Sequence, residues 1–322
     1  MHFYTIENAR HHASPAVGIG GEILDLGALD DAVPEAAALP HSLRGIIASG
    51  DEGMALVRRI AAQVEGSAAL ATRLREKGAL LPRDKARLLA PILDPGFVLS
   101  CGMNYHAHLR EMKSATPETP AHFAKNVAAI VGPGGAIKLP PSNPDMVDWE
   151  GEFCAVIGKP CHAVTEKDAL SYVAGYTLVN DVSARDWVAP ISQATGTMGP
   201  IMAWEHNILG KQFPTFCPMG PAFVTKDEIP DPANVAIETR VNGKVMQSAN
   251  TNDLVFSVVQ LIAYYSRFYL LRPGDVITTG SPSGVGYGRD PKVFLRPGDT
   301  VEVICAPIGT LANPVVGPEP RR

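Results

Sequence analysis

The chain has 322 residues, a net charge of −5 at neutral pH, 46% hydrophobic residues and 19% charged residues. This composition is ordinary for a globular protein, and the length allows one large domain plus a smaller one. The slight acidic excess offers no basic surface, so we expect neither nucleic acid nor a membrane as a partner.

The cysteines and the N-terminal residues indicate a compartment. The five cysteines are odd in number and scattered, without a CxxC pair, which favours reduced thiols over a disulfide framework or a zinc knuckle. The N-terminal stretch MHFYTIENAR lacks the basic-then-apolar pattern of a signal peptide, and no apolar run is long enough to span a bilayer. We therefore expect a cytoplasmic protein.

Residues 1–92 are expected to form a small, β-rich accessory domain. Three short segments have strand character, and a stretch with helix-compatible spacing of apolar residues follows them. The strands are expected at residues 3–6, 16–19 and 22–26, and the helical stretch at residues 54–77. Prolines at positions 91 and 95 mark the connection to a second domain, which we place at residues 93–322.

A candidate general base follows the first strand of the second domain, which is expected at residues 97–101. Beyond a Gly- and Asn-containing turn, His108 and Glu111 lie three residues apart and would be neighbours on one face of a helix. A carboxylate beside a histidine orients the ring and stabilises its protonated form. The same spacing is typical of a surface salt bridge, so both interpretations stay open at this point.

Alternating carboxylates open the segment DWEGEFCAVIGK at residues 148–159. Because side chains alternate across a strand, Asp148, Glu150 and Glu152 are expected on one face, with Gly151 leaving the opposite face bare. The rest of the segment has the apolar character of a buried strand. Like charges resist burial unless a cation joins them, so the pattern favours a divalent-metal site. A solvated strand edge is the alternative.

A further carboxylate is expected to reach the same place from a returning strand. Residues 165–168 resemble a capping box that opens a short helix, and residues 176–179 have strand character. A strand–helix–strand unit would then bring Asp181 opposite Glu150 and Glu152. Three oxygen ligands suit Mg²⁺ or Mn²⁺ better than zinc, and no histidine lies at a spacing that completes a zinc site. The alternative is that Asp181 caps the next helix.

The C-terminal half adds a candidate lid and a candidate cation. Residues 187–210, interrupted by glycines and a proline, are expected to form a long binding loop or lid. Lys211 follows as a cation that could lie near an anionic substrate, although exposed lysines are usually only solvated. The remaining expectations are an Asn-Gly hairpin at 242–243, an apolar helix at 254–270, and strands at 276–279 and 301–305 after two Leu-Arg-Pro-Gly-Asp turns.

A glycine-rich segment, TGSPSGVG, occupies residues 279–286 between those two turns. Its glycines match neither a dinucleotide-binding nor a P-loop pattern, and no helix follows, so a nucleotide-binding loop is not expected. The segment offers a hydroxyl and backbone N–H groups that could bind a carboxylate. A plain tight turn is the alternative.

Five segments, in this order, resemble motifs of the fumarylacetoacetate hydrolase family. They are GMNYHAHLREM, DWEGEFCAVIGK, GYTLVNDVSARD, VNGKVMQSANTNDLVFSVVQLIAYYS and LRPGDVITTGSPSGVG, and the similarity extends over residues 97–315. The resemblance implies an α+β, mainly β fold. Its catalytic domain would be a mixed β-sandwich or β-roll, usually homodimeric, preceded here by the small β-rich domain.

The resemblance also implies a set of site residues. Mg²⁺ or Mn²⁺, or Ca²⁺ as a substitute in a crystal, would be bound by Glu150, Glu152 and Asp181. His108 and Glu111 would form a water-activating dyad on a lid. Lys211 would assist at a developing negative charge, while Arg185, Ser281 and Gly280 would hold the substrate. Asp148 inherits no role from the family, and we expect it beside the ligands or in solvent.

The resulting hypothesis is a metal-dependent hydrolase that cleaves a carbon–carbon bond in a 1,3-dicarbonyl acid such as an acylpyruvate. Alternatives that keep the metal are decarboxylation of oxaloacetate-like acids and tautomerisation or isomerisation of unsaturated 2-oxo acids. An alternative from another class is a non-catalytic protein that binds oxo acids. Family members often carry Gln where this chain has Val188, and the following segment is long, so the sequence leaves the substrate open.

Overall fold

Strands supply most of the framework in the computed structural model, which describes residues 1–9, 11–29 and 32–318. The strands are β1 (His2–Glu7), β2 (Ala13–Ile19), β3 (Glu22–Asp25), β4 (Leu80–Pro82), β5 (Leu88–Leu89), β6 (Val98–Gly102), β7 (Ala121–Ala124), β8 (Ile130–Val131), β9 (Ile137–Lys138), β10 (Val147–Asp148), β11 (Gly151–Ile157), β12 (Val173–Asn180), β13 (Ser183–Ala184), β14 (Cys217–Thr225), β15 (Ala236–Val241), β16 (Lys244–Asn250), β17 (Val276–Thr278), β18 (Thr300–Cys305) and β19 (Gly309–Val316). The α-helices are α1 (Leu43–Ala48), α2 (Gly50–Glu65), α3 (Ala68–Glu76), α4 (His106–Glu111), α5 (Val188–Gln193), α6 (Met198–Leu209) and α7 (Val258–Tyr265).

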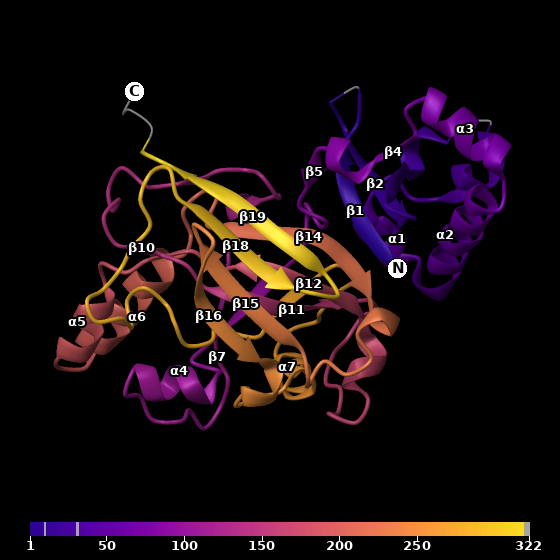
Figure 1. Ribbon diagram of the computed structural model, residues 1–322. Helices are drawn as coiled ribbons and strands as arrows, with labels where there is room; N and C mark the ends of the chain where they lie inside the picture. The colour runs from indigo at the N-terminus through magenta and orange to yellow at the C-terminus, as the bar shows by residue number, and fades with distance from the viewer. Residues whose placement is uncertain (10, 30–31, 319–322) are drawn as a thin grey trace.

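Two sheets pack face to face. The large sheet has the order β4-β3-β2-β1-β14-β12-β11-β17-β6-β7, and the second sheet has the order β16-β15-β18-β19-β9. In Figure 1 the orange and yellow strands of the second sheet lie in front of β11, β12 and β14. A buried apolar layer of both sheets, including Phe153, Leu178, Ile237 and Val303, fills the space between them. This is the mainly β, sandwich-like α+β fold that the sequence predicted.

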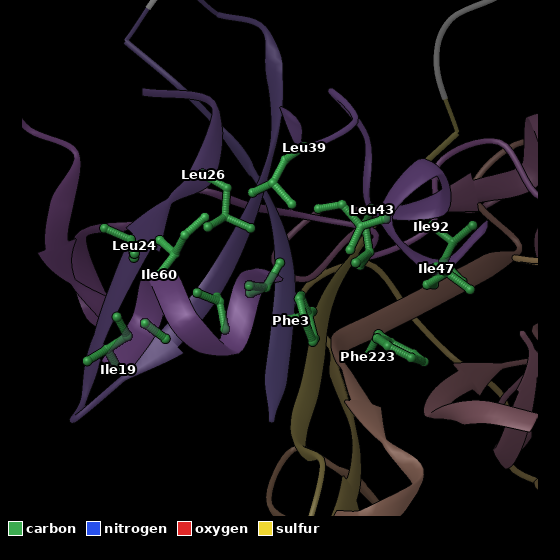
Figure 2. Close-up of a cluster of buried hydrophobic side chains, with 14 of the residues drawn as sticks. Phe3, Ile19, Leu24, Leu26, Leu39, Leu43, Ile47, Ile60, Ile92 and Phe223 are labelled. Atoms are coloured by element: carbon green, nitrogen blue, oxygen red, sulfur yellow. The ribbon is translucent and has the colours of Figure 1, made fainter. Parts of the chain in front are cut away.

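The N-terminal strands extend the large sheet. Strand β1 pairs antiparallel with β14, with Phe3 opposite Phe223, and the two rings lie 5.9 Å apart between centroids. Figure 2 shows these rings in one apolar cluster with side chains from β2, β3, α1 and α2. The three predicted N-terminal strands are confirmed. The large sheet and its apolar core both continue across residue 92. The proposed division into two domains at that residue stays a prediction.

Two of the predicted helices have different bounds in the structure. The helical stretch expected at residues 54–77 is two helices, because Ser67 interrupts it and its hydroxyl accepts a hydrogen bond from the Leu70 N–H at the start of α3. The apolar helix expected at residues 254–270 is shorter, since α7 begins after Ser257, which forms a capping box with Gln260. None of the helices in the described part of the chain combines the length and apolarity needed to cross a bilayer.

Strand β11 is buried on both faces. Phe153 and Ala155 belong to the core between the sheets, while Cys154 and Val156 belong to the core shared with the N-terminal segment. At its first residue the two sheets approach so closely that a Cβ on Gly151 would lie 2.2 Å from the Thr239 hydroxyl oxygen. The bare face that the sequence assigned to Gly151 is therefore covered by the second sheet.

Adding one methyl group at this contact should destabilise the protein. We expect Gly151→Ala to lower the free energy of unfolding by about 1–3 kcal/mol, the usual cost of overpacking. Gly199→Ala is the matched control, because its Cβ would have no neighbour nearer than 3.5 Å. Urea unfolding of both variants checks this, and equal stability of the two would contradict the close contact.

Strand β12 returns beside β11, as expected, but by a different route. The connection is a 3₁₀ turn (Ala169–Tyr172) instead of an α-helical crossover, and the two strands are antiparallel, with Gly151 opposite Asn180. This register places Asp181 just beyond the end of β12, where its N–H donates to the Glu150 carbonyl at 2.8 Å. The chain thus carries Asp181 to the first residues of the acidic strand.

The segment expected to be a long loop at residues 187–210 contains two helices. Pro190 and Pro200 each fall in the first turn of α5 and α6, where a proline is tolerated because no intrahelical N–H bond is lost. Gly196 has a φ of 71° in the connection between the helices. Figure 1 shows both helices on the same side of the molecule as α4.

Candidate active site

A cavity of about 430 Å³ lies where α4, α5 and α6 meet the ends of β11 and β12. Glu150, Glu152 and Asp181 line it together with two predicted cations, Arg185 and Lys211. His108 and Ser281 also line the cavity. The structure therefore brings residues from five sequence segments into one cavity.

The three predicted metal ligands converge in this cavity. One carboxylate oxygen from each of Glu150, Glu152 and Asp181 can be chosen so that all three lie within 4.8 Å of one another, and all three residues are buried. The solvated strand edge and the helix cap, the two alternatives considered for these residues, are both wrong. A buried set of three hard oxygen donors is suited to a divalent cation such as Mg²⁺ or Mn²⁺.

Two of the three carboxylates are paired with buried cations. The Lys211 ammonium donates to Glu150 at 2.5 Å, to Asp181 at 2.8 Å and to the Ser183 hydroxyl at 2.7 Å. Lys125 donates to the other oxygen of Asp181 and to the Lys211 carbonyl. Burial favours the neutral form of Glu150, but Arg185 and Lys211 outweigh it and hold the pKa of that carboxyl well below its usual range.

Glu152 is the carboxylate without an ion-pair partner among the described residues. Its exposed fraction is 1%, and one oxygen accepts a hydrogen bond from the Gly280 N–H at 3.1 Å. Burial, reinforced by the charges of Asp181 and Glu150, raises the pKa of Glu152 well above its ordinary value. Glu152 thus lacks the positive charge that would favour its ionised form; a divalent cation would supply that charge, and the residues fit such a cation.

The predicted substrate-binding residues line or adjoin the cavity, but each is engaged with the protein. The Arg185 guanidinium donates to Asp148 at 2.9 Å and to Glu150 at 2.5 Å. The Ser281 hydroxyl accepts from the Gln247 side chain at 2.8 Å. Gly280 gives its N–H to Glu152, so it orients a carboxylate of the triad. Substrate binding by these three residues stays a prediction.

The predicted dyad forms on α4. His108 Nδ1 lies 2.8 Å from Glu111 Oε2, and the other oxygen of Glu111 accepts from the Gly284 N–H at 2.9 Å. With Nδ1–H donating to the carboxylate, Nε2 is the nitrogen that can take up a proton. Both side chains are largely buried, so the surface salt bridge considered for this pair is wrong.

The side chain of Asn104, in the turn before α4, forms three hydrogen bonds to distant backbone groups. Asn104 donates to the carbonyls of Phe256 and Thr279 at 3.0 and 2.9 Å and accepts from the Phe256 N–H at 2.8 Å. The Ala107 N–H in the first turn of α4 donates to Asp253 at 2.9 Å. Asn104 thereby ties the start of α4 to the segment that precedes Gly280.

The expectation for Asp148 requires a correction. The strand is interrupted at Trp149 and Glu150, between β10 and β11, so Asp148 does not continue the alternation of the other carboxylates. It is completely buried and accepts from Arg185 and from the N–H groups of Gly286 and Tyr287. The solvent-exposed alternative for Asp148 is therefore wrong.

The chain resembles known proteins over most of its length. The family model for the fumarylacetoacetate (FAA) hydrolase C-terminal domain matches residues 98–316. The mitochondrial oxaloacetate tautomerase of Bos taurus is 43% identical over 312 residues, which are 96% of this chain and 90% of the relative. Because that relative is named a mitochondrial protein, the comparison contradicts the cytoplasmic location expected from the sequence.

Two solved structures share the fold. The fumarylacetoacetate hydrolase of psychrophilic Exiguobacterium antarcticum has a TM-score of 0.76 and 33% identity, with 98% of this chain and 99% of that chain covered. The maleylpyruvate hydrolase of Sphingobium sp. SYK-6, in complex with manganese (II) ion and pyruvate, has a TM-score of 0.70 and 28% identity, with 99% and 100% covered.

Proposed function

The chain belongs to the fumarylacetoacetate hydrolase family, and on that premise we propose that it is a metal-dependent tautomerase of a short 2-oxo acid such as oxaloacetate. The observation that carries the proposal is one cavity in which a histidine–carboxylate dyad accompanies a buried carboxylate triad. Tautomerisation needs one proton moved at carbon and a stabilised enolate oxygen, and this pairing of groups can supply both.

The relatives favour tautomerisation over hydrolysis, the reaction that the sequence led us to expect. The relative named an oxaloacetate tautomerase is 43% identical over 96% of this chain, whereas the two structures named hydrolases are 33% and 28% identical. Hydrolysis would require the dyad to activate a water molecule, while tautomerisation uses the same dyad on the substrate itself. His108 is the proton acceptor in both reactions, and the proton donor differs: water in hydrolysis, a carbon of the substrate in tautomerisation.

The proposed chemistry assigns distinct tasks to the residues. A divalent cation held by Glu150, Glu152 and Asp181 would supply a Lewis acid that polarises the oxygens of a 2-oxo acid. His108 Nε2 takes a proton from the carbon next to the 2-oxo group in the keto form and then gives a proton to the enolate oxygen, which completes the enol. In the reverse direction it takes the proton from the enol oxygen and gives one to the carbon. Glu111 keeps the ring in the required tautomer and stabilises the imidazolium.

Lys211 contacts two of the three triad carboxylates. In this structure the ammonium gives its three N–H bonds to Glu150, Asp181 and Ser183, and so holds two triad carboxylates in place. The stabilisation of a developing negative charge that we predicted for Lys211 stays a prediction. Val188, Ile191 and Trp204 from α5 and α6 add apolar side chains to the cavity wall. The homodimer likewise stays a prediction.

Product analysis tests the proposal. The protein is incubated with oxaloacetate and with an acylpyruvate, in Mn²⁺ and in excess chelator, and products are followed by mass spectrometry and NMR. We expect faster interconversion of enol and keto oxaloacetate in Mn²⁺, with no change in mass. Release of carbon dioxide as the main product, or of two organic acids from the acylpyruvate, would contradict a tautomerase. Binding without turnover of either compound would instead indicate a non-catalytic protein.

A further inference from the structure

A five-residue loop, residues 284–288, contacts both halves of the site. At one end, the Gly284 N–H donates to Glu111 of the dyad at 2.9 Å. Two residues later, the Gly286 and Tyr287 N–H groups donate to the two oxygens of Asp148 at 2.6 and 3.0 Å. The loop therefore receives the dyad carboxylate and is itself fixed to Asp148 at the end of β10, two residues before Glu150.

Asp148 is also linked to the triad, through Arg185. Its second oxygen accepts from Arg185 Nε at 2.9 Å, and another nitrogen of the same guanidinium donates to Glu150 at 2.5 Å. The Trp149 N–H adds a bond at 2.9 Å, so the buried carboxylate accepts four hydrogen bonds. A buried carboxylate with this number of donors has a fixed orientation, and it fixes the groups that donate to it.

The loop packs against both carboxylates with no spare room. A Cβ on Gly286 would lie 1.9 Å from the Val293 carbonyl oxygen and 2.8 Å from Asp148 Oδ1. A Cβ on Gly288 would lie 2.6 Å from the carboxyl carbon of Glu111. Because side chains are excluded at both contacts, the backbone of the loop sets the distance between Asp148 and Glu111.

We propose that Asp148 is a positioning residue that holds the 284–288 loop where it receives Glu111, and so aligns the dyad with the carboxylate triad. The inference rests on the proposed catalytic role of the dyad. Asp148 does not line the cavity and acts only through the loop and through Arg185. The hydrogen bond between the Gly284 N–H and Glu111 thus depends on Asp148, which lies two positions before Glu150 in the sequence.

Hydrogen exchange of the metal-free protein tests this without any substrate. Asp148→Asn presents an amide N–H₂ to donors, so the Gly286 and Tyr287 bonds cannot both be kept. We expect exchange at the Gly284 amide, whose own partner Glu111 is unchanged, to accelerate at least about tenfold, as a local opening worth about 1.4 kcal/mol would produce. Asp145→Asn, an exposed carboxylate three residues earlier, is the matched control and should change nothing.

Faster exchange at Gly286 and Tyr287 with unchanged exchange at Gly284 would overturn the proposal. If Asp148→Asn does not fold, Gly286→Ala displaces the same loop without altering any charge, and the same outcome at Gly284 is expected. This readout stands even if the proposed tautomerase activity is absent, because it involves no substrate or metal.

A double-mutant cycle gives the second readout. We expect Asp148→Asn to lower kcat about 10–100-fold, as loss of an orienting partner commonly does. In a Glu111→Ala background, Asp148→Asn should lower kcat by less than about threefold, because the carboxylate that the loop positions is already absent. If Asp148→Asn lowered kcat by the same factor in the wild-type and the Glu111→Ala proteins, Asp148 would act on the triad through Arg185 and not on the dyad.

Discussion

Replacing Glu152 by glutamine is expected to stabilise the metal-free protein while weakening the binding of Mn²⁺ at least about 100-fold, since loss of orienting partners alone often costs 10–100-fold. The carboxylate is buried beside Glu150 and Asp181, and the described residues provide no ion-pair partner for it. Glutamine removes the repulsion and keeps an oxygen that can accept the Gly280 N–H. We expect the melting temperature in chelator to rise by about 2 °C or more, which corresponds to roughly 1 kcal/mol.

The pH dependence of this effect has a definite sign. Because burial and like charges raise the pKa of Glu152 in the folded state, the stability linked to its proton is complete below the unfolded pKa and is lost as the pH rises through the folded pKa. Wild type and Glu152→Gln should therefore have similar melting temperatures near pH 4 and diverge toward pH 8. Calorimetry in chelator at both pH values measures the difference.

Asp181→Asn is the matched comparison, with the opposite expectation for stability. Asp181 accepts from both Lys125 and Lys211, so its loss leaves two buried ammonium groups short of a counter-charge. Breaking a buried ion pair from one side commonly costs about 3–5 kcal/mol, and we expect the melting temperature of the metal-free protein to fall. If both variants shifted the melting temperature in the same direction, the charge distribution described here would be wrong.

Replacing His108 by alanine should remove turnover and leave the metal site intact. A positioned general base contributes about 10²–10⁴-fold to rate, and His108 is the imidazole that lines the cavity among the described residues. We expect kcat to fall by that factor, with the affinity for Mn²⁺ unchanged within about threefold. Steady-state kinetics on oxaloacetate and calorimetric titration with Mn²⁺ measure the two quantities.

His106 offers a control on the same helix. It is the first residue of α4, is exposed and does not line the cavity. His106→Ala should therefore keep wild-type kcat. Retention of full turnover in His108→Ala, or an equal loss in both variants, would remove the dyad from the mechanism.

Local rules pointed to the ligands and the dyad but left alternatives open for both. The alternation of Glu150 and Glu152 and the return of a strand before Asp181 indicated that the three side chains lie close together. In the structure Glu150 lies in the interruption before β11, and β12 returns antiparallel without a helical crossover. The three-residue spacing of His108 and Glu111 likewise followed from helix geometry. Their role in a metal-dependent enzyme came from the resemblance to a family, since spacing alone could not separate it from a salt bridge.

Long-range contacts were out of reach of the sequence. Lys125 pairs with Asp181, 56 residues away, and nothing near Lys125 marks it as buried. Asp148 matched the alternation of its neighbours, but its partners come from Arg185 and from backbone N–H groups more than 130 residues further on. The helices α5 and α6 were missed because two glycines and Pro200 were taken as loop signals, although a proline in the first turn is compatible with a helix.

The central claim is that enolisation depends on a cation held by the buried triad. It is tested most directly by following the conversion of enol-oxaloacetate to its keto form, in metal-free protein and after addition of Mn²⁺, with wild type and Glu152→Gln side by side. We predict a large acceleration for Mn²⁺-loaded wild type, and rates equal to the protein-free Mn²⁺ blank for Glu152→Gln. Equal acceleration by wild type in excess chelator, or by Glu152→Gln in Mn²⁺, would contradict the account.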